Sequence, residues 1–271
     1  RIVGAQADLR KRLASWSPGD VDKFIARHYQ SYWLRTDTKT QVEHAELLRD
    51  AQGAKTKLAT RVTTDAFTAI TELTVFAPNH ARLLALFAGA CAAAGSNIVG
   101  AHIATTRDGY ALDSFLLARE FADDADELRR AKRIVEMIDR LLRGKESLQH
   151  LLTRKRPAAR SVEAFTVEPE VIINNALSER LTVLEVAGRD RPGLLYDLTN
   201  AISDLSLDIA SAHITTFGEK AVDVFYVTDL TGKQVVSETR QAAIRERLTK
   251  VLTPPDAAQS TKVEALSAEK R

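Results

Sequence analysis

The stretch SNIVGAHIATT, from Ser96 to Thr106, recurs as LDIASAHITT, from Leu207 to Thr216. The two copies lie about 111 residues apart, and self-similarity of this kind is the signature of a repeated structural unit. At matching spacing, Ile98, Ala101, His102 and Ile103 recur as Ile209, Ala212, His213 and Ile214. The chain is therefore expected to contain two copies of one unit.

The similarity extends outward in both directions. Upstream, ELTVFAPNHARLLALFAGACAAAG from Glu72 parallels LTVLEVAGRDRPGLLYDLTNAISDL from Leu181. Downstream, YALDSFLL from Tyr110 parallels AVDVFYV from Ala221. Each copy thus shows a β-rich run, a polar loop, an amphipathic stretch and two further β-prone runs.

The second copy predicts the order of elements. A run rich in β-branched residues ends at Gly188, and apolar residues from Leu194 to Leu205 then recur at helical spacing. Two β-prone runs follow, joined by a short connection that contains Gly218, and a second helix is expected from Ser237 to Leu252. Strand, helix, strand, strand, helix is the order of a ferredoxin-like unit. We expect an α+β fold, with two ferredoxin-like βαββαβ units sharing a sheet after a short helical segment.

The rest of the chain is assigned around these units. The expected domains are a helical segment (1–52), a first unit with a long helical insertion (53–175), a second unit (176–255) and a disordered tail (256–271). Short helices are predicted at Leu9–Trp16, at Gly19–His28 after the capping residue Ser17, and at Thr38–Ala51. A weak strand is expected at 58–62, and a helix-prone insertion from Asp124 to about Leu152. The candidate closing strand, Val167–Ile173, can serve either sheet.

Composition excludes several functional classes. Lys and Arg (38) nearly balance Asp and Glu (36), so we expect no nucleic-acid partner. No run approaches 18 apolar residues, and Cys91 alone cannot form an internal disulfide. We therefore expect a cytoplasmic protein with no membrane partner and a buried, inert Cys91. The chain begins at Arg1 without an initiating Met, as expected of a piece of a longer protein.

The repeated units resemble a known family of domains. A DRPGLL loop (Asp190–Leu195) followed by DIASAHITT and AVDVFYVTD resembles ACT domains, which bind amino acids and similar effectors at sheet edges. More narrowly, YWLRTDTKTQVEHA (Tyr32–Ala45) and SAHITTFGEKAVDVFYVTDLTGKQV (Ser211–Val235) resemble the C-terminal part of the PII uridylyltransferase/uridylyl-removing enzyme family. In that family a nucleotidyltransferase domain modifies the nitrogen-signalling protein PII, an HD-type domain removes the uridylyl group, and the ACT pair reports glutamine.

The resemblance implies a regulatory role. The chain lacks a Gly-Ser element followed by paired aspartates and has no His-Asp dipeptide, so no catalytic residue is assigned, although the parent family are enzymes. Residues 1–52 would be the tail of the HD-type region. The expected function is glutamine-sensing allosteric regulation, with L-glutamine as ligand and PII as partner of the complete enzyme. No cofactor is expected in this chain, and Mg²⁺ only in the complete enzyme. The alternative is a non-catalytic scaffold that pairs with PII or with itself through sheet edges.

A ligand site is predicted where the Asp190–Leu195 loop meets the segment from Asn97 to Gly100. The residues assigned to it are Asp190, Arg191, Gly193, Leu194, Leu195, Asn97, Ile98, Val99 and Gly100. Main-chain amides of Gly193 and Leu194 would hold a carboxylate, while Asp190 or Asn97 orients an ammonium or amide group. The alternative, open at this point, is that Asp190 caps the following helix and Pro192 opens it.

A second, weaker site is predicted at the equivalent place in the repeat. Its residues are Asn79, His80, Leu83, Asp208, Ile209 and Ser211. Arg82 takes the place of Gly193 there, so a bulky side chain stands where the first site has none.

No metal site is assigned. His102 and His213 lack further ligands at suitable spacing and are interpreted as structural, and His28 and His44 as surface or packing residues. The carboxylates Asp123–Asp126 are expected to serve a helix N-terminus. Arg154–Arg160 is expected to be an exposed basic linker.

Overall fold

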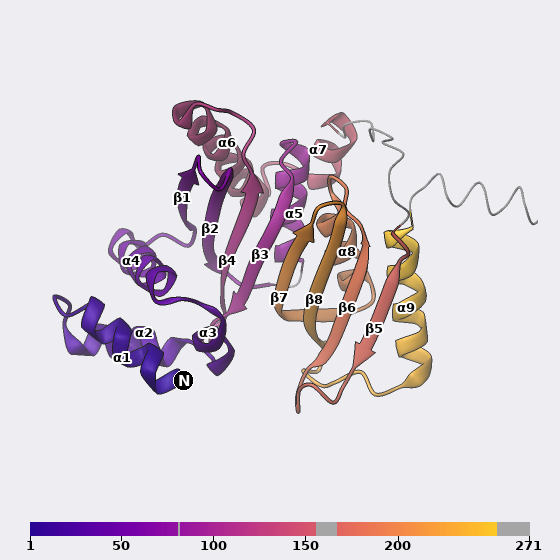
Figure 1. The fold of residues 1–271 in the computed structure, drawn as a ribbon, viewed down its shortest axis with the longest axis horizontal. Coiled ribbons are helices and arrows are strands. Elements are labelled where there is room, and N and C mark those ends of the chain that lie inside the picture. Colours follow the sequence, from indigo (N-terminus) through magenta and orange to yellow (C-terminus); the bar gives the residue numbers. More distant parts are fainter. Residues whose placement is uncertain (81, 156–166, 254–271) are drawn as a thin grey trace, which may run out of the picture. The chain divides into compact units, whose positions relative to one another are not determined.

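The computed structural model describes residues 1–80, 82–155 and 167–253. Figure 1 shows the helices and strands of these residues. In chain order they are α1 (Ile2–Arg12), α2 (Pro18–Arg27), α3 (Gln30–Arg35), α4 (Thr38–Ala54), β1 (Ala59–Asp65), β2 (Ile70–Pro78), α5 (Leu83–Ala93), β3 (Ile98–Thr105), β4 (Tyr110–Ala118), α6 (Asp124–Leu142), α7 (Leu148–Lys155), β5 (Glu170–Asn174), β6 (Thr182–Arg189), α8 (Leu194–Asp204), β7 (Leu207–Phe217), β8 (Lys220–Asp229) and α9 (Glu238–Leu252).

The described strands form an eight-stranded sheet in the order β1-β2-β4-β3-β7-β8-β6-β5. The pairs β1–β2, β2–β4, β5–β6, β6–β8 and β7–β8 are antiparallel. Strands β3 and β7, which carry the two copies of the repeated stretch, are neighbours in this order. The expected α+β fold, with ferredoxin-like units sharing a sheet, is therefore confirmed.

Contacts divide the described chain into two units that do not follow the repeat. The first unit holds 1–80 and 102–135, and the second holds 82–101, 136–155 and 167–253. Helix α5 belongs to the first copy of the repeat, yet it lies in the second unit and packs against α8. The second unit thus contains α5 of the first copy packed against α8 of the second copy.

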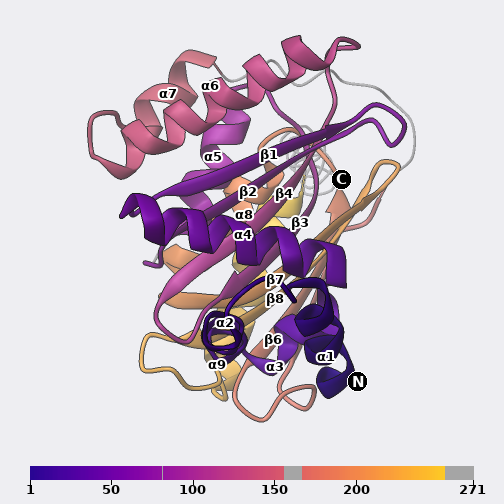
Figure 2. The same cartoon turned by 90° about the vertical axis from the view of Figure 1, so that its left-hand side faces the viewer.

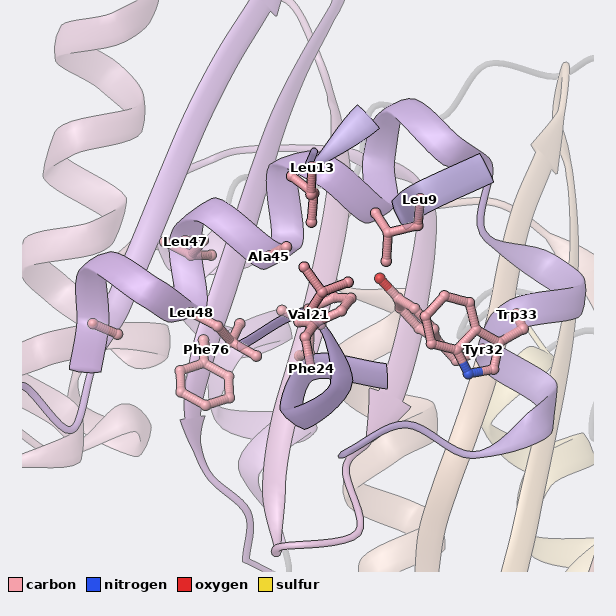
Figure 3. Close-up of a cluster of buried hydrophobic side chains, with 12 residues drawn as sticks. Leu9, Leu13, Val21, Phe24, Tyr32, Trp33, Ala45, Leu47, Leu48 and Phe76 are labelled. Atoms are coloured by element: carbon pink, nitrogen blue, oxygen red, sulfur yellow. The ribbon is translucent and has the colours of Figure 1, made fainter. Parts of the chain in front are cut away.

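The first unit has a hydrophobic core beneath its N-terminal helices. Figure 3 shows apolar side chains of α1 to α4 gathered around Val21 and Phe24. Its buried members are Leu9, Leu13, Val21, Phe24, Tyr32, Trp33, Ala45, Leu47, Leu48, Ala51, Phe76 and Leu112. Phe76 comes from β2 and Leu112 from β4, and α4 also packs against β1 (Figure 2). The N-terminal helices are therefore anchored to the strands of this unit by buried apolar surface.

Two histidines lie inside this core. His28 stacks on Tyr32 with ring centroids 3.9 Å apart. The Tyr32 hydroxyl is 3.0 Å from Nδ1 of His44, whose Nε2 is 3.4 Å from the Ser114 hydroxyl. Burial lowers the pKa of His28 to about 3 and that of His44 to about 4. Both rings are therefore neutral packing residues at pH 7, as one of the two sequence interpretations proposed.

The N-terminal helices follow the sequence pattern with one addition. Ser17 caps α2 as predicted, since its hydroxyl accepts a hydrogen bond from the Asp20 backbone N–H at 3.2 Å. Helices α1 and α4 overlap the predicted segments with shifted ends. Helix α3 was not predicted, because its six residues are too few to display an apolar periodicity.

The second unit follows the predicted order of elements. Strand β6 leads into α8, and β7 and β8 form a hairpin in which Phe217 pairs with Lys220. Gly218 in this tight turn adopts φ +61°, a conformation that glycine accepts readily. Helix α8 packs against α9, and Figure 1 shows both on one face of β7, β8, β6 and β5. Ser237 caps α9, its hydroxyl accepting a hydrogen bond from the Arg240 backbone N–H at 3.4 Å.

The structure also decides the expectations for segments outside the second copy of the repeat. The strand near residues 167–173 is β5, and it pairs with β6 of the second unit. The weak strand expected at 58–62 is β1. The helix-prone insertion expected from Asp124 to about Leu152 consists of two helices, because α6 ends at Leu142 and α7 begins at Leu148. Gly144 between them takes φ +65°, outside the helical range.

Some expected segments fall partly or wholly outside the described residues. Of the basic linker expected at Arg154–Arg160, the first two residues end α7 and the rest lies outside the described ranges. The tail expected at 256–271 lies outside them entirely. The acidic run before α6 behaves as expected, because Asp123 accepts hydrogen bonds from the backbone N–H groups of Ala125 and Asp126.

Candidate ligand-binding site

A pocket opens at the N-terminal end of α8, within the second unit. Counting the solvent at its mouth, it has about 360 Å³ of space. Its walls come from α5, residues 96–98 at the start of β3, the loop at 190–193, the first turn of α8, and strands β7 and β8. The lining residues are Ala88, Ala92, Ser96, Asn97, Ile98, Asp190, Arg191, Gly193, Leu194, Leu195, Tyr196, Ile214, Thr216, Ala221 and Asp223.

The pocket brings together most of the residues assigned to the first site. Asn97 and Ile98 meet the loop residues Asp190, Arg191, Gly193, Leu194 and Leu195. Val99 and Gly100 lie farther along β3 and do not line the pocket. The sequence reasoning missed the contributions of α5, Tyr196, β7 and β8. Ile214 and Thr216 of β7 lie within the repeated stretch and Tyr196 directly follows the loop, but their part in the pocket depends on strand pairing and helix packing, which no local pattern records.

The loop before α8 is shaped by a glycine. Gly193 is the N-cap of α8 with φ +81°, in the left-handed region that side chains with a Cβ adopt at a cost. The Leu194 backbone N–H donates to the Arg191 carbonyl at 3.0 Å. The proposed use of the Leu194 amide for a ligand carboxylate is therefore wrong in this conformation. The amides of Gly193 and Leu195 remain the candidates, because the first turn of a helix offers N–H groups without intrahelical acceptors.

Asp190 does not cap the helix. Helix α8 begins at Leu194, and its N-cap Gly193 receives no side-chain cap. The Asp190 carboxyl instead accepts hydrogen bonds from the side chains of Asn97 and Thr216 and from the Arg191 backbone N–H. The alternative reading, with Asp190 as cap and Pro192 as first helical residue, is therefore wrong. Partial burial raises the pKa of Asp190, and these hydrogen bonds oppose the rise.

Arg191 is already engaged by its own unit. Its Nη1 lies 2.7 Å from Oδ2 of Asp197 in the first turn of α8, and its Nη2 donates to the Val251 carbonyl at 3.2 Å. These contacts tie the loop to α8 and α9. Arg191 therefore fixes the loop rather than offering an uncommitted cation to the pocket.

The most buried polar residue among those that line the pocket is Asp223 of β8. Its side chain is 2% exposed, and burial raises its pKa to about 7. The Thr215 backbone N–H donates to the carboxyl, but Oδ1 has no hydrogen-bond partner among the described residues. A sequence signal existed, because Ala221, Asp223, Phe225 and Val227 alternate on one face of a strand and the other three are apolar.

The second predicted site is divided between the two units. Asn79 and His80 lie in the first unit, and Leu83, Asp208, Ile209 and Ser211 in the second. Within the second unit, Arg82 takes the role of Gly193 before α5, with φ +74°. Its Nη2 lies 2.6 Å from Oδ1 of Asp204 at the end of α8. The arginine that replaces glycine is thus held by a carboxylate of the neighbouring helix.

The described residues hold no group of three or more His, Cys, Asp or Glu side chains that could bind a metal ion. His102 and His213 are both exposed, on the faces of β3 and β7 away from the buried residues beside them. Cys91 is fully buried in α5, as expected. The expectation of no cofactor in this chain, with Mg²⁺ only in the complete enzyme, stays a prediction. Within residues 1–80, 82–155 and 167–253, no helix combines the length and apolar character needed to span a bilayer.

Comparisons with known proteins agree with this architecture. Residues 170–257 match a family model described as an ACR9-like, ACT-like domain. The crystal structure of an aspartate kinase from Synechocystis is matched at 16% identity over 68% of this chain and 27% of that chain, with a TM-score of 0.37 that supports no conclusion.

Similarity in sequence extends along nearly the whole chain. A bifunctional uridylyltransferase/uridylyl-removing enzyme of Bradyrhizobium sp. is 50% identical over 95% of this chain, and one of Rhodopseudomonas palustris 51% over 96%. The corresponding enzyme of Nitrobacter hamburgensis is 48% identical over 96%. The chain spans 28% of the length of each of these relatives. It is therefore similar, from one end to the other, to the C-terminal region of bifunctional uridylyltransferase/uridylyl-removing enzymes, with an ACT-like fold.

Proposed function

We propose that this chain is a regulatory region that binds L-glutamine in the pocket at the start of α8. The observation that carries the proposal is the meeting of the Asp190–Leu195 loop with Asn97 in one pocket. The similarity to the C-terminal region of the bifunctional enzymes and the ACT-like fold support a regulatory role.

The polar groups of the pocket suit an amino acid. The amides of Gly193 and Leu195 at the positive end of the α8 dipole would hold the α-carboxylate. The Asn97 side chain offers both a donor and an acceptor to the ligand's side-chain amide. Glutamate would replace the amide NH₂ by a charged oxygen and leave an acceptor of the pocket unpaired, at a cost of about 1–3 kcal/mol. Glutamine is therefore expected to bind more tightly than glutamate.

The test is calorimetric titration of the purified chain with glutamine and glutamate. Asp190→Ala is expected to weaken glutamine binding about tenfold or more, because the hydrogen bond from Asn97 to the Asp190 carboxyl, which positions Asn97 in the pocket, is lost. Gly193→Arg places a long side chain at the mouth of the pocket, and Arg82 demonstrates that arginine can adopt this backbone conformation. Arg82→Gly is the matched control and should leave glutamine binding unchanged. Parent-like affinity of both Asp190→Ala and Gly193→Arg, with intact circular dichroism, would disprove the site.

We further propose that in a complete enzyme this region passes the glutamine signal to uridylyl transfer to, and removal from, the PII protein. The purified chain itself is expected to do neither. Incubation with PII, UTP and Mg²⁺, followed by mass spectrometry of PII, tests this point. Absence of saturable glutamine binding would favour the alternative role as a scaffold that pairs through sheet edges.

A further inference from the structure

We propose that Asp223 is the specificity-determining residue of the pocket and pairs, through its Oδ1 atom, with the ammonium group of an α-amino acid. This inference rests on the proposed function and names the group that selects an amine-bearing ligand. Asp223 lies in β8, outside the two segments from which the ligand site was first assigned.

One oxygen of the Asp223 carboxyl lacks a hydrogen-bond partner among the described residues. Asp223 is 2% exposed, faces the pocket, and its Oδ1 has no partner among the described residues. A buried polar atom without a partner costs about 1–3 kcal/mol, so a residue of this kind calls for a specific explanation. An ammonium group is a three-donor cation that would satisfy Oδ1 and offset the burial of the charge.

The surroundings of Asp223 favour a cation over an anion. The charged residues lining the pocket are Asp190 and Arg191, both from the loop before α8. Arg191 is paired with Asp197, while Asp190 adds a second carboxyl that raises the pKa of Asp223. The pocket-lining residues of α5 are Ala88 and Ala92, and those of β7 are Ile214 and Thr216, none of them charged. The loop and strand thus present two carboxyls to one small space.

Binding of the amino acid then displaces a proton from the Asp223 carboxyl. Burial raises the pKa of Asp223 to about 7, so the carboxyl is partly protonated near neutral pH. When the ligand's ammonium approaches Oδ1, the carboxyl O–H bond breaks, the proton passes to solvent, and the carboxylate pairs with the cation. Ligand affinity is therefore expected to rise with pH as Asp223 ionises.

The repeat supplies a matched control. Asp113 occupies the same place in the first copy and is 1% exposed, but it is not among the residues that line the pocket. Asp113→Asn and Asp223→Asn are both nearly isosteric changes of a buried carboxyl in a strand. A loss of binding confined to Asp223→Asn therefore reports on the pocket rather than on burial in general.

The experiment is calorimetry of the full chain at pH 7 in phosphate and in Tris, whose ionisation enthalpies differ. The probes are L-glutamine and glutaramate, which lacks the amino group. The parent is expected to release a measurable fraction of a proton on binding glutamine and to bind glutaramate about 10- to 100-fold more weakly. Asp223→Asn should lose the proton release and bind glutamine about 10- to 100-fold more weakly, while Asp113→Asn behaves like the parent.

Failure of this inference can be distinguished from failure of the proposed function. If the parent binds glutamine without releasing a proton, or binds glutaramate equally well, Asp223 is not the ammonium partner. The same conclusion follows if Asp223→Asn binds glutamine like the parent. If none of the twenty amino acids binds the parent, the proposed function itself fails and this inference falls with it. The first two readouts need no variant, so misfolding of Asp223→Asn leaves the test intact.

Discussion

Asp113 and Asp223 stand at equivalent positions of the repeat, in YALDSFLL and AVDVFYV, and both carboxyls are buried. Burial raises the pKa of Asp113 to about 8 and that of Asp223 to about 7. Asp113 accepts a hydrogen bond from the Ala104 backbone N–H, whereas Asp223 faces a pocket with one oxygen unpaired among the described residues. The carboxyl at this position is thus hydrogen-bonded to backbone in the first copy and faces a pocket in the second.

Asp113→Asn is expected to make stability less sensitive to alkaline pH. The folded pKa of Asp113 is raised above its unfolded value, so its contribution is fully present below about pH 4 and is lost as the pH rises toward 8. The asparagine variant lacks this slope, and its free energy of unfolding should fall less than that of the parent, by about 1 kcal/mol per pH unit. Urea unfolding at pH 5, 6, 7 and 8 measures the difference. If the free energy of unfolding depends on pH in the same way for parent and variant, the raised pKa of Asp113 is ruled out.

His28→Phe is expected to protect the N-terminal helices against acid. The folded pKa of His28 is lowered, so its contribution is present above about pH 6.5 and is lost as the pH falls through about 3. Phenylalanine keeps the stacking on Tyr32 and removes Nε2, which has no partner among the described residues. The variant should unfold at lower pH and gain about 1 kcal/mol at pH 7. Acid unfolding followed by tryptophan fluorescence reports on the Trp33 environment.

His44→Phe is the contrasting variant in the same core. It removes the contacts of the ring with the hydroxyls of Tyr32 and Ser114 and leaves both hydroxyls buried. A loss of about 1–3 kcal/mol is expected. Equal stabilities of the two phenylalanine variants would contradict the distinction between the two histidines.

Gly89→Ala is expected to loosen the packing of α5. A Cβ at position 89 would lie 2.6 Å from Leu148 Cδ2 and 2.9 Å from Tyr196 Cδ2, so the packed side chains of Leu148 and Tyr196 must move. Overpacking costs about 1–3 kcal/mol, which outweighs the helix-propensity gain of about 1 kcal/mol. Gly53→Ala in α4 meets no atom within 4 Å and should be neutral or stabilising. Thermal unfolding of the two variants provides the comparison. A stabilised Gly89→Ala would show that the packing around α5 accommodates an added methyl group.

Gly193→Ala is expected to lower stability by about 1–2 kcal/mol through backbone strain alone. The new Cβ would make an ordinary contact 3.7 Å from the Ala92 Cβ, so no clash contributes. Arg82→Gly removes the same strain at the equivalent position but also the exposed ion pair with Asp204, which is worth about 0–1 kcal/mol. The glycine variant should therefore be as stable as the parent or slightly more so. Denaturant titration of both variants at pH 7 tests the pair, and a destabilised Arg82→Gly would show that the ion pair outweighs the strain.

The sequence by itself determined the features that depend on neighbouring residues. The repeat, the helical periodicity after Gly193, the tight turn at Gly218 and the cap at Ser17 all follow from residues within a few positions of one another. Capping, turn geometry and amphipathic spacing are local effects, so their signals are present in a short window of sequence. The loop that forms one wall of the pocket could be found for the same reason.

Only the tertiary structure decided which distant segments meet. It assigned β5 to β6, placed α5 beside α8, and showed that Asp190 bonds to Asn97 and Thr216 instead of capping a helix. It also showed that Asp223 lines the pocket and Asp113 does not, although the two occupy equivalent positions in the repeat. Strand pairing and the cost of burying a polar atom depend on partners far along the chain, and no local pattern records whether such a partner is there.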